Sequence, residues 1–268
     1  MKAVILARGL GTRMRAADQG AALSAVEAQA ADTGVKSMVP VGDRPFLDYI
    51  LSGLADAGCT RICLVIGPEH DEIRARYTKV VPPRRFAMNF AIQERPLGTG
   101  DAVRAARDFA GDDEFLMINS DNYYPTHVLE TLVSMRGPGT VLFFPGPLAA
   151  KSNIEPERIL AFALGRVGAD GCLDALVEKP DAEQVAAMGE QRLVSMNCWR
   201  FPPAIMTACR DLKPSRRGEL ELTDAIMATI AAGVRYEVRT SDDGVLDLSK
   251  RGDIPAVRAR LAGVSVSL

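Results

Sequence analysis

The sequence has little net charge and no long apolar run. Among its 268 residues, 32 lysines and arginines face 34 aspartates and glutamates, which gives a formal net charge of −2. This balance offers no electrostatic reason to expect nucleic acid or an anionic membrane as a partner. No apolar stretch approaches the ~20 residues that a membrane span requires. A small anionic ligand would therefore have to be held by a few basic residues.

The sequence also lacks the cysteine and histidine spacing of a zinc site. Its five cysteines are scattered, and the pair Cys59 and Cys63 has no second pair and no nearby histidine. We therefore interpret the cysteines as small hydrophobic side chains in a reducing cytoplasm. The N-terminal apolar run, about six residues long, is too short for a signal peptide. We expect it to be a buried strand of a cytoplasmic protein.

Short β-branched apolar runs alternate along the chain with longer amphipathic stretches. This pattern is typical of an α/β fold with a largely parallel sheet. The expected strands lie at 3–6, 61–67, 86–93, 114–120, 140–144 and 158–164. The expected helices lie at 46–58, 70–77 and 99–109. Segment 158–178 has apolar runs on both sides of a glycine-rich turn, which predicts a hairpin.

No internal repeat, low-complexity tract or linker divides the chain, so we predict a single domain over residues 1–268. Residues 15–35 stand apart because they are rich in alanine, glutamine and small polar residues. We interpret them as an insertion. Either a helix or a mobile loop that becomes ordered on a ligand would fit this composition.

The first expected strand runs directly into a turn that contains Gly9 and Gly11 and is followed by Arg13. Such glycines permit a tight turn with positive φ and let backbone N–H groups approach a phosphate. An arginine beyond the turn supplies a charged fork for phosphate oxygens. A Rossmann dinucleotide site, and with it an NAD-linked oxidoreductase, would require glycine or alanine where this sequence has Met14. The P-loop motif is absent, and a purely structural turn stays open.

The turn and the segments after it resemble a known family. The runs from Gly9 to Met14 and from Lys36 to Val41 are similar to the signature of the sugar-phosphate nucleotidyltransferases, which include glucose-1-phosphate uridylyl- and thymidylyltransferases. Further matches follow in family order at Gln93, Gly98-Thr99, Asn119 to Asn122, Glu178 to Pro180, Asn197, Glu219 to Asp224 and Leu246-Asp247. The resemblance implies a glycosyltransferase-A-like nucleotidyltransferase fold. This is a Rossmann-like, mostly parallel sheet flanked by helices, with a small β-rich sugar-binding part.

The resemblance also implies an enzyme that joins the nucleoside monophosphate of an NTP to a sugar 1-phosphate and releases pyrophosphate. Residues 1–125 would mainly bind the nucleotide and residues 126–250 the sugar phosphate. The expected nucleotide-binding residues are Leu6, Gly9, Gly11, Thr12, Gln93 and Gly98. The expected catalytic residues are Arg13, which would hold the triphosphate, and Lys36, beside the reacting phosphates. The amide of Gln93 offers a donor and an acceptor, which suits uracil or thymine and favours UTP or dTTP.

Asp121 follows the apolar run from Phe115 to Asn119, so it should project from the carboxyl end of a central strand. Ligands bind at that edge of open α/β sheets. A carboxylate there, with no lysine or arginine adjacent in sequence, is either a turn-forming residue or a metal ligand. The resemblance assigns Asp121 and Asp247 to Mg²⁺. It further implies that the sugar phosphate is bound by Glu178, Lys179 and Asn197.

The sequence departs from the family pattern in several places. Arg8 replaces the usual small residue, and the 22 residues between Arg13 and Lys36 are about twice the usual number. The segment around Asp247 lacks the usual tryptophan and Gly-Thr neighbours. These departures leave open a phosphorylated acceptor other than glucose 1-phosphate.

A catalytically silent protein that binds a nucleotide sugar as a regulator also stays open, although the retained carboxylates Asp121 and Asp247 favour an enzyme. The chain continues only briefly after Asp247, so we expect no hexapeptide-repeat β-helix and no trimer built by one. A homo-oligomer built in another way stays open. We assign no chemistry to Glu219, and we expect surface or core roles for His70 and His127.

Overall fold

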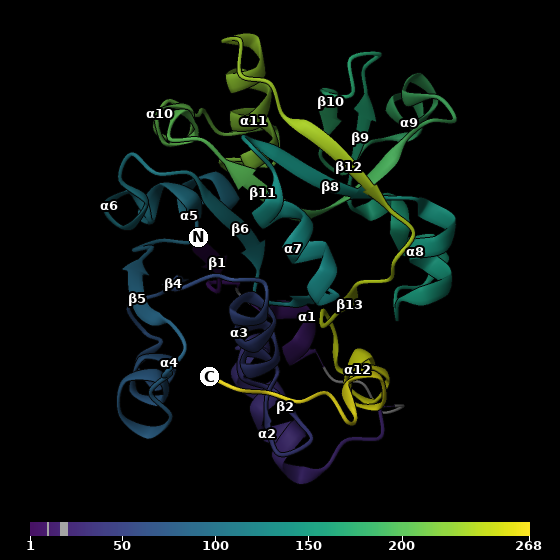
Figure 1. Ribbon diagram of the computed structural model, residues 1–268. Coiled ribbons are helices and arrows are strands. Elements are labelled where there is room, and N and C mark those ends of the chain that lie inside the picture. The colour runs from purple at the N-terminus through teal and green to yellow at the C-terminus, as the bar shows by residue number, and fades with distance from the viewer. Residues whose placement is uncertain (10, 17–20) are drawn as a thin grey trace.

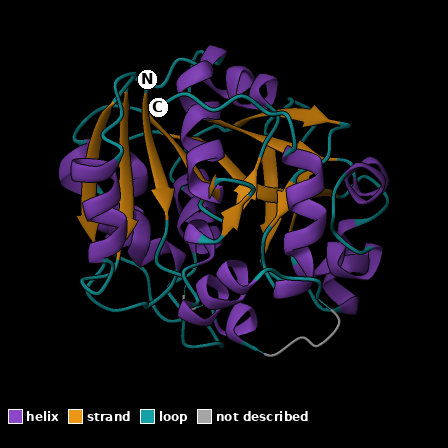
Figure 2. Cartoon of the chain, turned by 90° about the horizontal axis from the view of Figure 1, so that it is seen from below, coloured by secondary structure: helices purple, strands orange, loops and turns teal. Residues whose placement is uncertain are grey.

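The computed structural model describes residues 1–9, 11–16 and 21–268. Within these residues the chain forms a nine-stranded sheet with helices packed on both faces (Figures 1 and 2). The strands of this sheet are β1 (Lys2–Leu6), β4 (Arg61–Ile66), β5 (Ala87–Ile92), β6 (Phe115–Asn119), β8 (Gly139–Phe143), β9 (Ala163–Val167), β10 (Leu173–Val177), β11 (Leu193–Phe201) and β12 (Glu237–Ser241). Two small ribbons lie beside it, β2 (Pro40–Val41) with β3 (Arg44–Pro45) and β7 (Asn122–Tyr123) with β13 (Leu246–Asp247).

The first half of the sheet is parallel, in the order β5, β4, β1 and β6. Leu6, at the end of β1, is in register with Val65 of β4 and with Asn119 of β6. The carboxyl ends of these strands therefore meet at one edge, where α/β proteins bind ligands. The predicted α/β fold with a parallel sheet is confirmed in this half.

The second half of the sheet is mostly antiparallel and is organised by β11, which pairs with β6, β8 and β9. At its edge, β12 pairs with β8 in parallel. The predicted hairpin is present as β9 and β10. The predicted strand at 158–164 is wrong over its first part, because the 3₁₀ helix η3 (Pro156–Ala161) occupies it and β9 begins at Ala163. The fixed φ of Pro156, the first residue of η3, suits a helix start.

Alternate residues of the parallel strands enter two separate cores. Ala3 and Ile5 of β1 belong to one core, and Val4 belongs to the other. The first core contains side chains of α3 (Phe46–Asp56), α7 (Thr126–Ser134) and α12 (Ile254–Leu261). The second contains side chains of α5 (Thr99–Ala105), α10 (Ala204–Arg210) and α11 (Leu222–Ala231). None of the described helices is long and apolar enough to cross a membrane.

The remaining helical segments are short and lie in the connections. They are α1 (Thr12–Arg15), α4 (Asp71–Ala75), the π segment η2 (Arg76–Val80), α6 (Arg107–Ala110), α8 (Pro145–Lys151), α9 (Ala182–Met188), and the 3₁₀ helices η1 (Lys36–Met38) and η4 (Arg251–Asp253). Two expected helices are thus divided: the one at 70–77 continues as a π segment, and the one at 99–109 is interrupted at Ala106.

The expected insertion at 15–35 contains the helix α2 (Ala25–Thr33), while residues 17–20 of it lie outside the described residues. A reciprocal capping box between Ser24 and Glu27 begins the helix. The buried Glu27 carboxylate pairs with Arg258 Nη1 at 2.6 Å, and Arg251 binds Asp32. The C-terminal segment therefore anchors the insertion onto the body of the domain.

Candidate active site

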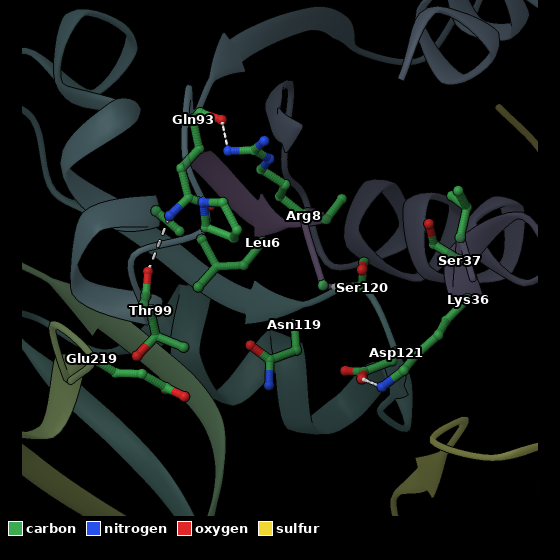
Figure 3. A pocket seen from close by; sticks show the side chains of 16 residues that line it. Leu6, Arg8, Lys36, Ser37, Gln93, Thr99, Asn119, Ser120, Asp121 and Glu219 are labelled. Atoms are coloured by element: carbon green, nitrogen blue, oxygen red, sulfur yellow. Dashed lines mark hydrogen bonds and ion pairs between the residues drawn. The ribbon is translucent and has the colours of Figure 1, made fainter. Parts of the chain in front are cut away.

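A cavity of about 320 Å³ lies at the carboxyl edge of the parallel strands. Leu6, Gln93 and Asn119 bring the ends of β1, β5 and β6 to its wall, as Figure 3 shows. Lys36, from the segment after the insertion, and Glu219, from the loop before α11, complete the wall. The cavity therefore combines residues from both halves of the domain.

The glycine-rich turn after β1 forms one side of the cavity. Gly9 lines it, and a Cβ added there would meet no atom within 4 Å. Gly11 has φ 61°, and a Cβ on it would lie 1.9 Å from the carbonyl oxygen of Gly34, so only glycine fits. Gly9 does not have a positive φ, so the steric need for glycine is shown at Gly11. Thr12 and Arg13 follow at the start of α1, are exposed and lie outside the cavity lining.

Lys36 and Asp121 form an ion pair on the cavity wall. The Nζ atom of Lys36 donates to Oδ2 of Asp121 at 2.8 Å, and Figure 3 shows the two side chains directed toward each other. The backbone around Asp121 is fixed, because Ser120 N–H donates to the carbonyl of Leu6 and Leu248 N–H donates to that of Asp121. The backbone that carries Asp121 is therefore held at the end of the central strand.

Asp247 is brought to this place by the pairing of β13 with β7, in which it lies opposite Asn122. It is buried, with 2% of its surface exposed. Its Oδ1 accepts from Asn122 Nδ2 at 3.1 Å, and its Oδ2 accepts from Arg158 Nη2 at 2.6 Å. Burial raises the pKa of Asp247, and the negative charge of Asp121 adds to the rise. Each carboxylate is therefore within the electrostatic reach of the other.

Gln93 lies at the opposite end of the cavity from Asp121 (Figure 3), and Gly98 also lines the cavity. The carboxamide Nε2 of Gln93 donates to the carbonyl oxygen of Gly98 at 3.1 Å and to Oδ2 of Asp101 at 2.9 Å. Gly98 has φ 131°, and a Cβ on it would lie 2.6 Å from backbone atoms of Leu220. This close approach packs the start of α5 against the loop that carries Glu219.

Arg8 crosses the ends of two strands beside this site. Its Nη1 donates to the backbone carbonyl of Gln93, and its Nε and Nη2 donate to the Glu69 carboxylate at 3.4 and 3.3 Å. The side chain is only 9% exposed and lines the cavity. His70 lies next to Glu69 and accepts a hydrogen bond from Gly67 N–H; burial lowers the pKa of His70. Arg8, which departs from the family pattern, thus links the segments that follow β1, β4 and β5.

Glu178, Lys179 and Asn197 lie in the second half of the domain. Lys179 and Asn197 have φ of 42° and 58°, and they are the non-glycine residues with positive φ among the described residues. Burial raises the pKa of Glu178, and the nearby charge of Glu221 raises it further. Arg217 connects Glu178 to the cavity, because its Nη2 lies 4.0 Å from a carboxylate oxygen of Glu178 and of Glu219.

The comparison with known sequences decides the family. Residues 2–248 match the sequence profile of the nucleotidyl transferase family. The chain belongs to this family. It is 29% identical over 254 residues to a low-salt glycan biosynthesis nucleotidyltransferase of Haloferax volcanii, covering 95% of this chain and 64% of that protein. It is 32% identical over 235 residues to a glucose-1-phosphate thymidylyltransferase of Streptomyces griseus, covering 87% of this chain and 58% of that protein.

The chain therefore spans about three fifths of the length of these two relatives, 64% and 58%. A solved structure of UDP-glucose pyrophosphorylase complexed with UDP-glucose superposes with a TM-score of 0.73 at 19% identity. The superposition covers 97% of this chain and 98% of that one. The predicted family and the predicted fold are confirmed.

Several cavity residues had no assigned role in the sequence. Thr99, Ser120 and Glu219 line the cavity, although they had entered only as parts of matching motifs. Arg8 had been noted only as a departure from the family. Arg217 was missed altogether, since neither its neighbours nor its spacing indicates that it joins Glu178 to Glu219. The signal for Glu219 was present in its motif, but its position at the cavity comes from the contact between Gly98 and Leu220.

Asp121 lines the cavity, and Asp247 lies near it without lining the cavity itself; these two carboxylates could hold a metal ion. No group of three or more histidine, cysteine, aspartate or glutamate side chains in the described part of the chain is arranged to bind one. Two carboxylates nevertheless suit Mg²⁺, which takes one or two from a protein and completes its shell with water and phosphate oxygens. All five cysteines are free thiols, in agreement with the interpretation from the sequence.

Proposed function

We propose that this chain joins the nucleoside monophosphate of an NTP to a sugar 1-phosphate, with release of pyrophosphate. The Lys36–Asp121 pair at the end of the central strand, beside the Gly9 turn, is the observation that carries the proposal. A cation and a carboxylate at this edge suit a reaction between two phosphates. The activities named for the relatives point to the same reaction.

The proposed reaction needs no general base. The phosphate of a sugar 1-phosphate is largely ionised at neutral pH, because the second pKa of a phosphomonoester is ~6. The protein must hold two anions in line and offset the charge that develops at the α-phosphorus. Lys36 would turn its ammonium from Asp121 to phosphate oxygens at this point. Arg13, which is exposed beside the turn, would hold the triphosphate as pyrophosphate leaves.

Asp121 and Asp247 would hold Mg²⁺, the cofactor expected from the resemblance. The burial of Asp247 and the nearness of Asp121 both disfavour a second negative charge there, and a bound cation would favour it. When bound, Mg²⁺ would neutralise charge on the phosphate under attack. Asn122 and Arg158 would keep the Asp247 carboxylate oriented, since they donate to its two oxygens.

The two ends of the site would separate the base from the sugar. The base would meet Gln93 and Gly98, and UTP or dTTP is favoured. The rest of the nucleotide would contact Leu6, Gly9, Gly11 and Thr12. The sugar phosphate would contact Glu178, Lys179 and Asn197. The left-handed backbone of the last two residues costs free energy, and such strain is often retained at binding sites.

The free thiols and the NTP substrate fit a cytoplasmic setting, which we include in the proposal. The first experiment measures pyrophosphate release with Mg²⁺ from ATP, CTP, GTP, UTP and dTTP, each against a panel of sugar 1-phosphates. Release that requires both substrates is the expected result, and the pair with the highest kcat/KM identifies base and sugar. Binding of a nucleotide without turnover would contradict the proposal for these acceptors and favour a regulator that binds nucleotide sugars.

A further inference from the structure

Gln93 is fixed at all but one of its hydrogen-bonding atoms. Its backbone N–H donates to Ile66 O at 2.9 Å, and its carbonyl accepts from Arg8, as the upper dashed line in Figure 3 marks. Its Nε2 uses both hydrogens, one on Gly98 O and one on Asp101 Oδ2. The side-chain Oε1 accepts from no described residue and is not among the buried atoms that lack a partner. It is therefore the atom of Gln93 that remains for a ligand in the cavity.

Asp101 determines which way round the Gln93 carboxamide lies. A carboxylate and a carbonyl accept hydrogen bonds but do not donate them, so Nε2 must face Asp101 and Gly98. The reversed amide would place Oε1 against two oxygens. Asp101 is itself held, because it is 5% exposed and its other oxygen accepts from Arg104 Nη2 at 2.6 Å. It does not line the nucleotide cavity, so it can act there only through Gln93.

We infer that Asp101, by orienting Gln93, makes the site select nucleotides with a keto base. Oε1 can only accept, so the edge of the base that meets it must donate. Uracil, thymine, guanine and hypoxanthine each carry a ring N–H beside a carbonyl. Cytosine and adenine instead carry a lone-pair nitrogen at this ring position, which would face Oε1 without a hydrogen. Their exocyclic amino group could donate to Oε1 only if the base shifted from the position that a keto base occupies. The inference rests on the proposed function, which already favours UTP or dTTP, and adds Asp101 as the residue that orients Gln93 for such a base.

The test compares kcat/KM within two pairs of nucleotides, UTP with CTP and ITP with ATP, using one sugar 1-phosphate. The members of each pair share a ring system and differ mainly at the edge in question. The wild-type enzyme should favour the keto member by about 100-fold or more, because a site that hydrogen-bonds a substrate group rejects the analogue without it. The pyrimidine pair decides if neither purine is used.

Asp101→Asn is the diagnostic variant. The amide of this variant would still accept from Arg104 through Oδ1 and would present an N–H to Gln93. The reversed Gln93 carboxamide, with Oε1 toward residue 101, would then accept this N–H. Both keto-to-amino ratios should then fall by about tenfold, the value of roughly one hydrogen bond. A purely structural defect would lower kcat/KM for every nucleotide together and leave the ratios unchanged. Asp108→Asn, which alters an exposed carboxylate on α6, is the matched control and should keep both ratios.

Arg104→Gln provides a second variant if Asp101→Asn does not fold. The Arg104 side chain is 47% exposed, so its removal should spare the fold while releasing Asp101, and the ratios should fall by a smaller factor. Unchanged ratios in the folded variants, or a wild type that uses CTP as well as UTP, would overturn the inference and leave the transferase intact. An absence of turnover with every nucleotide would instead contradict the proposed function.

Discussion

The ammonium nitrogen of Lys36 lies 2.8 Å from Oδ2 of Asp121, across 85 positions of the chain. The two side chains are 14% and 25% exposed, so water and salt screen the pair less than they would at the surface. The pair places a cation and an anion on one cavity wall. That wall can therefore meet phosphate oxygens through Lys36 and a metal ion through Asp121.

Asp121→Asn should lower kcat by at least about 100-fold, because the proposed reaction would lose a proposed metal carboxylate and the ion-pair partner of Lys36. The melting temperature should change by only a few degrees, since Asn keeps the shape and the backbone contacts. Steady-state pyrophosphate release and thermal unfolding measure the two effects. Asp112→Asn, at an exposed position before β6, should behave like the wild type. Near-normal turnover of Asp121→Asn would remove this residue from the mechanism.

Gly11→Ala and Gly9→Ala should differ sharply in stability. A methyl group at Gly11 meets the Gly34 backbone in a left-handed conformation, whereas at Gly9 it meets nothing. We expect Gly11→Ala to lower the free energy of unfolding by about 1–3 kcal/mol, and Gly9→Ala to change it by less than about 0.5 kcal/mol. Chemical denaturation measures both. Equal losses would show that the Gly11–Gly34 contact is not the constraint. Because Gly9 lines the cavity, its variant should raise the KM for the NTP.

Arg251→Met should destabilise the protein and reduce its activity together. Arg251 is 10% exposed, donates to Met14 O at 2.9 Å and binds Asp32, so its loss leaves acceptors without their partner. The expected loss is about 2–3 kcal/mol of unfolding free energy. Activity should also fall, because Gly34, the C-cap of α2, packs against Gly11, so a displaced α2 would disturb the turn beside the cavity. Arg239→Met removes an exposed ion pair with Glu237 and should cost at most about 1 kcal/mol. Similar losses of unfolding free energy in Arg251→Met and Arg239→Met would argue against a special role of Arg251 in holding α2.

Glu178→Gln should become more stable than the wild type as the pH rises. Burial raises the pKa of Glu178 above its ordinary value of 4.5, so the folded chain binds more protons than the unfolded chain just above that pH. The stability of the wild type therefore falls as the pH rises from 4.5 through the folded pKa. The Glu178→Gln variant has no titrating group at this position, so its stability does not fall for this reason. Melting temperatures of both proteins between about pH 4.5 and 7.5 test the trend. A difference in melting temperature that stays constant with pH would contradict the trend. In the Glu178→Gln variant, the KM for the sugar 1-phosphate should also rise.

The sequence predicted those parts of the site that depend on one segment of chain. The apolar run before Asp121 predicted this residue at a strand end, and in the structure it lies just beyond the carboxyl end of β6. The Gly9 turn directly follows β1, and Gln93 directly follows β5, where local patterns also suffice. These residues are near each other because parallel strands end at one edge.

The remaining contacts depend on pairings that leave no local pattern. The β7–β13 ribbon has two residues in each strand, too few for a periodic signal, yet it sets Asp247 beside Asn122. The positive φ of Lys179 is unusual for a lysine, and nothing in the residue type predicts this backbone conformation. Strand β11 was not expected, because its pairing with three neighbours is a property of the whole sheet.

The β7–β13 ribbon also relates the chemistry to the order in which a ribosome makes the chain. Asp247 leaves the ribosome 125 residues after its partner Asn122, whereas Lys36 and Asp121 both lie in the part made earlier. Domains generally fold as units. The proposed metal site is therefore complete only after synthesis has passed β13, although Lys36 and Asp121 are made much earlier.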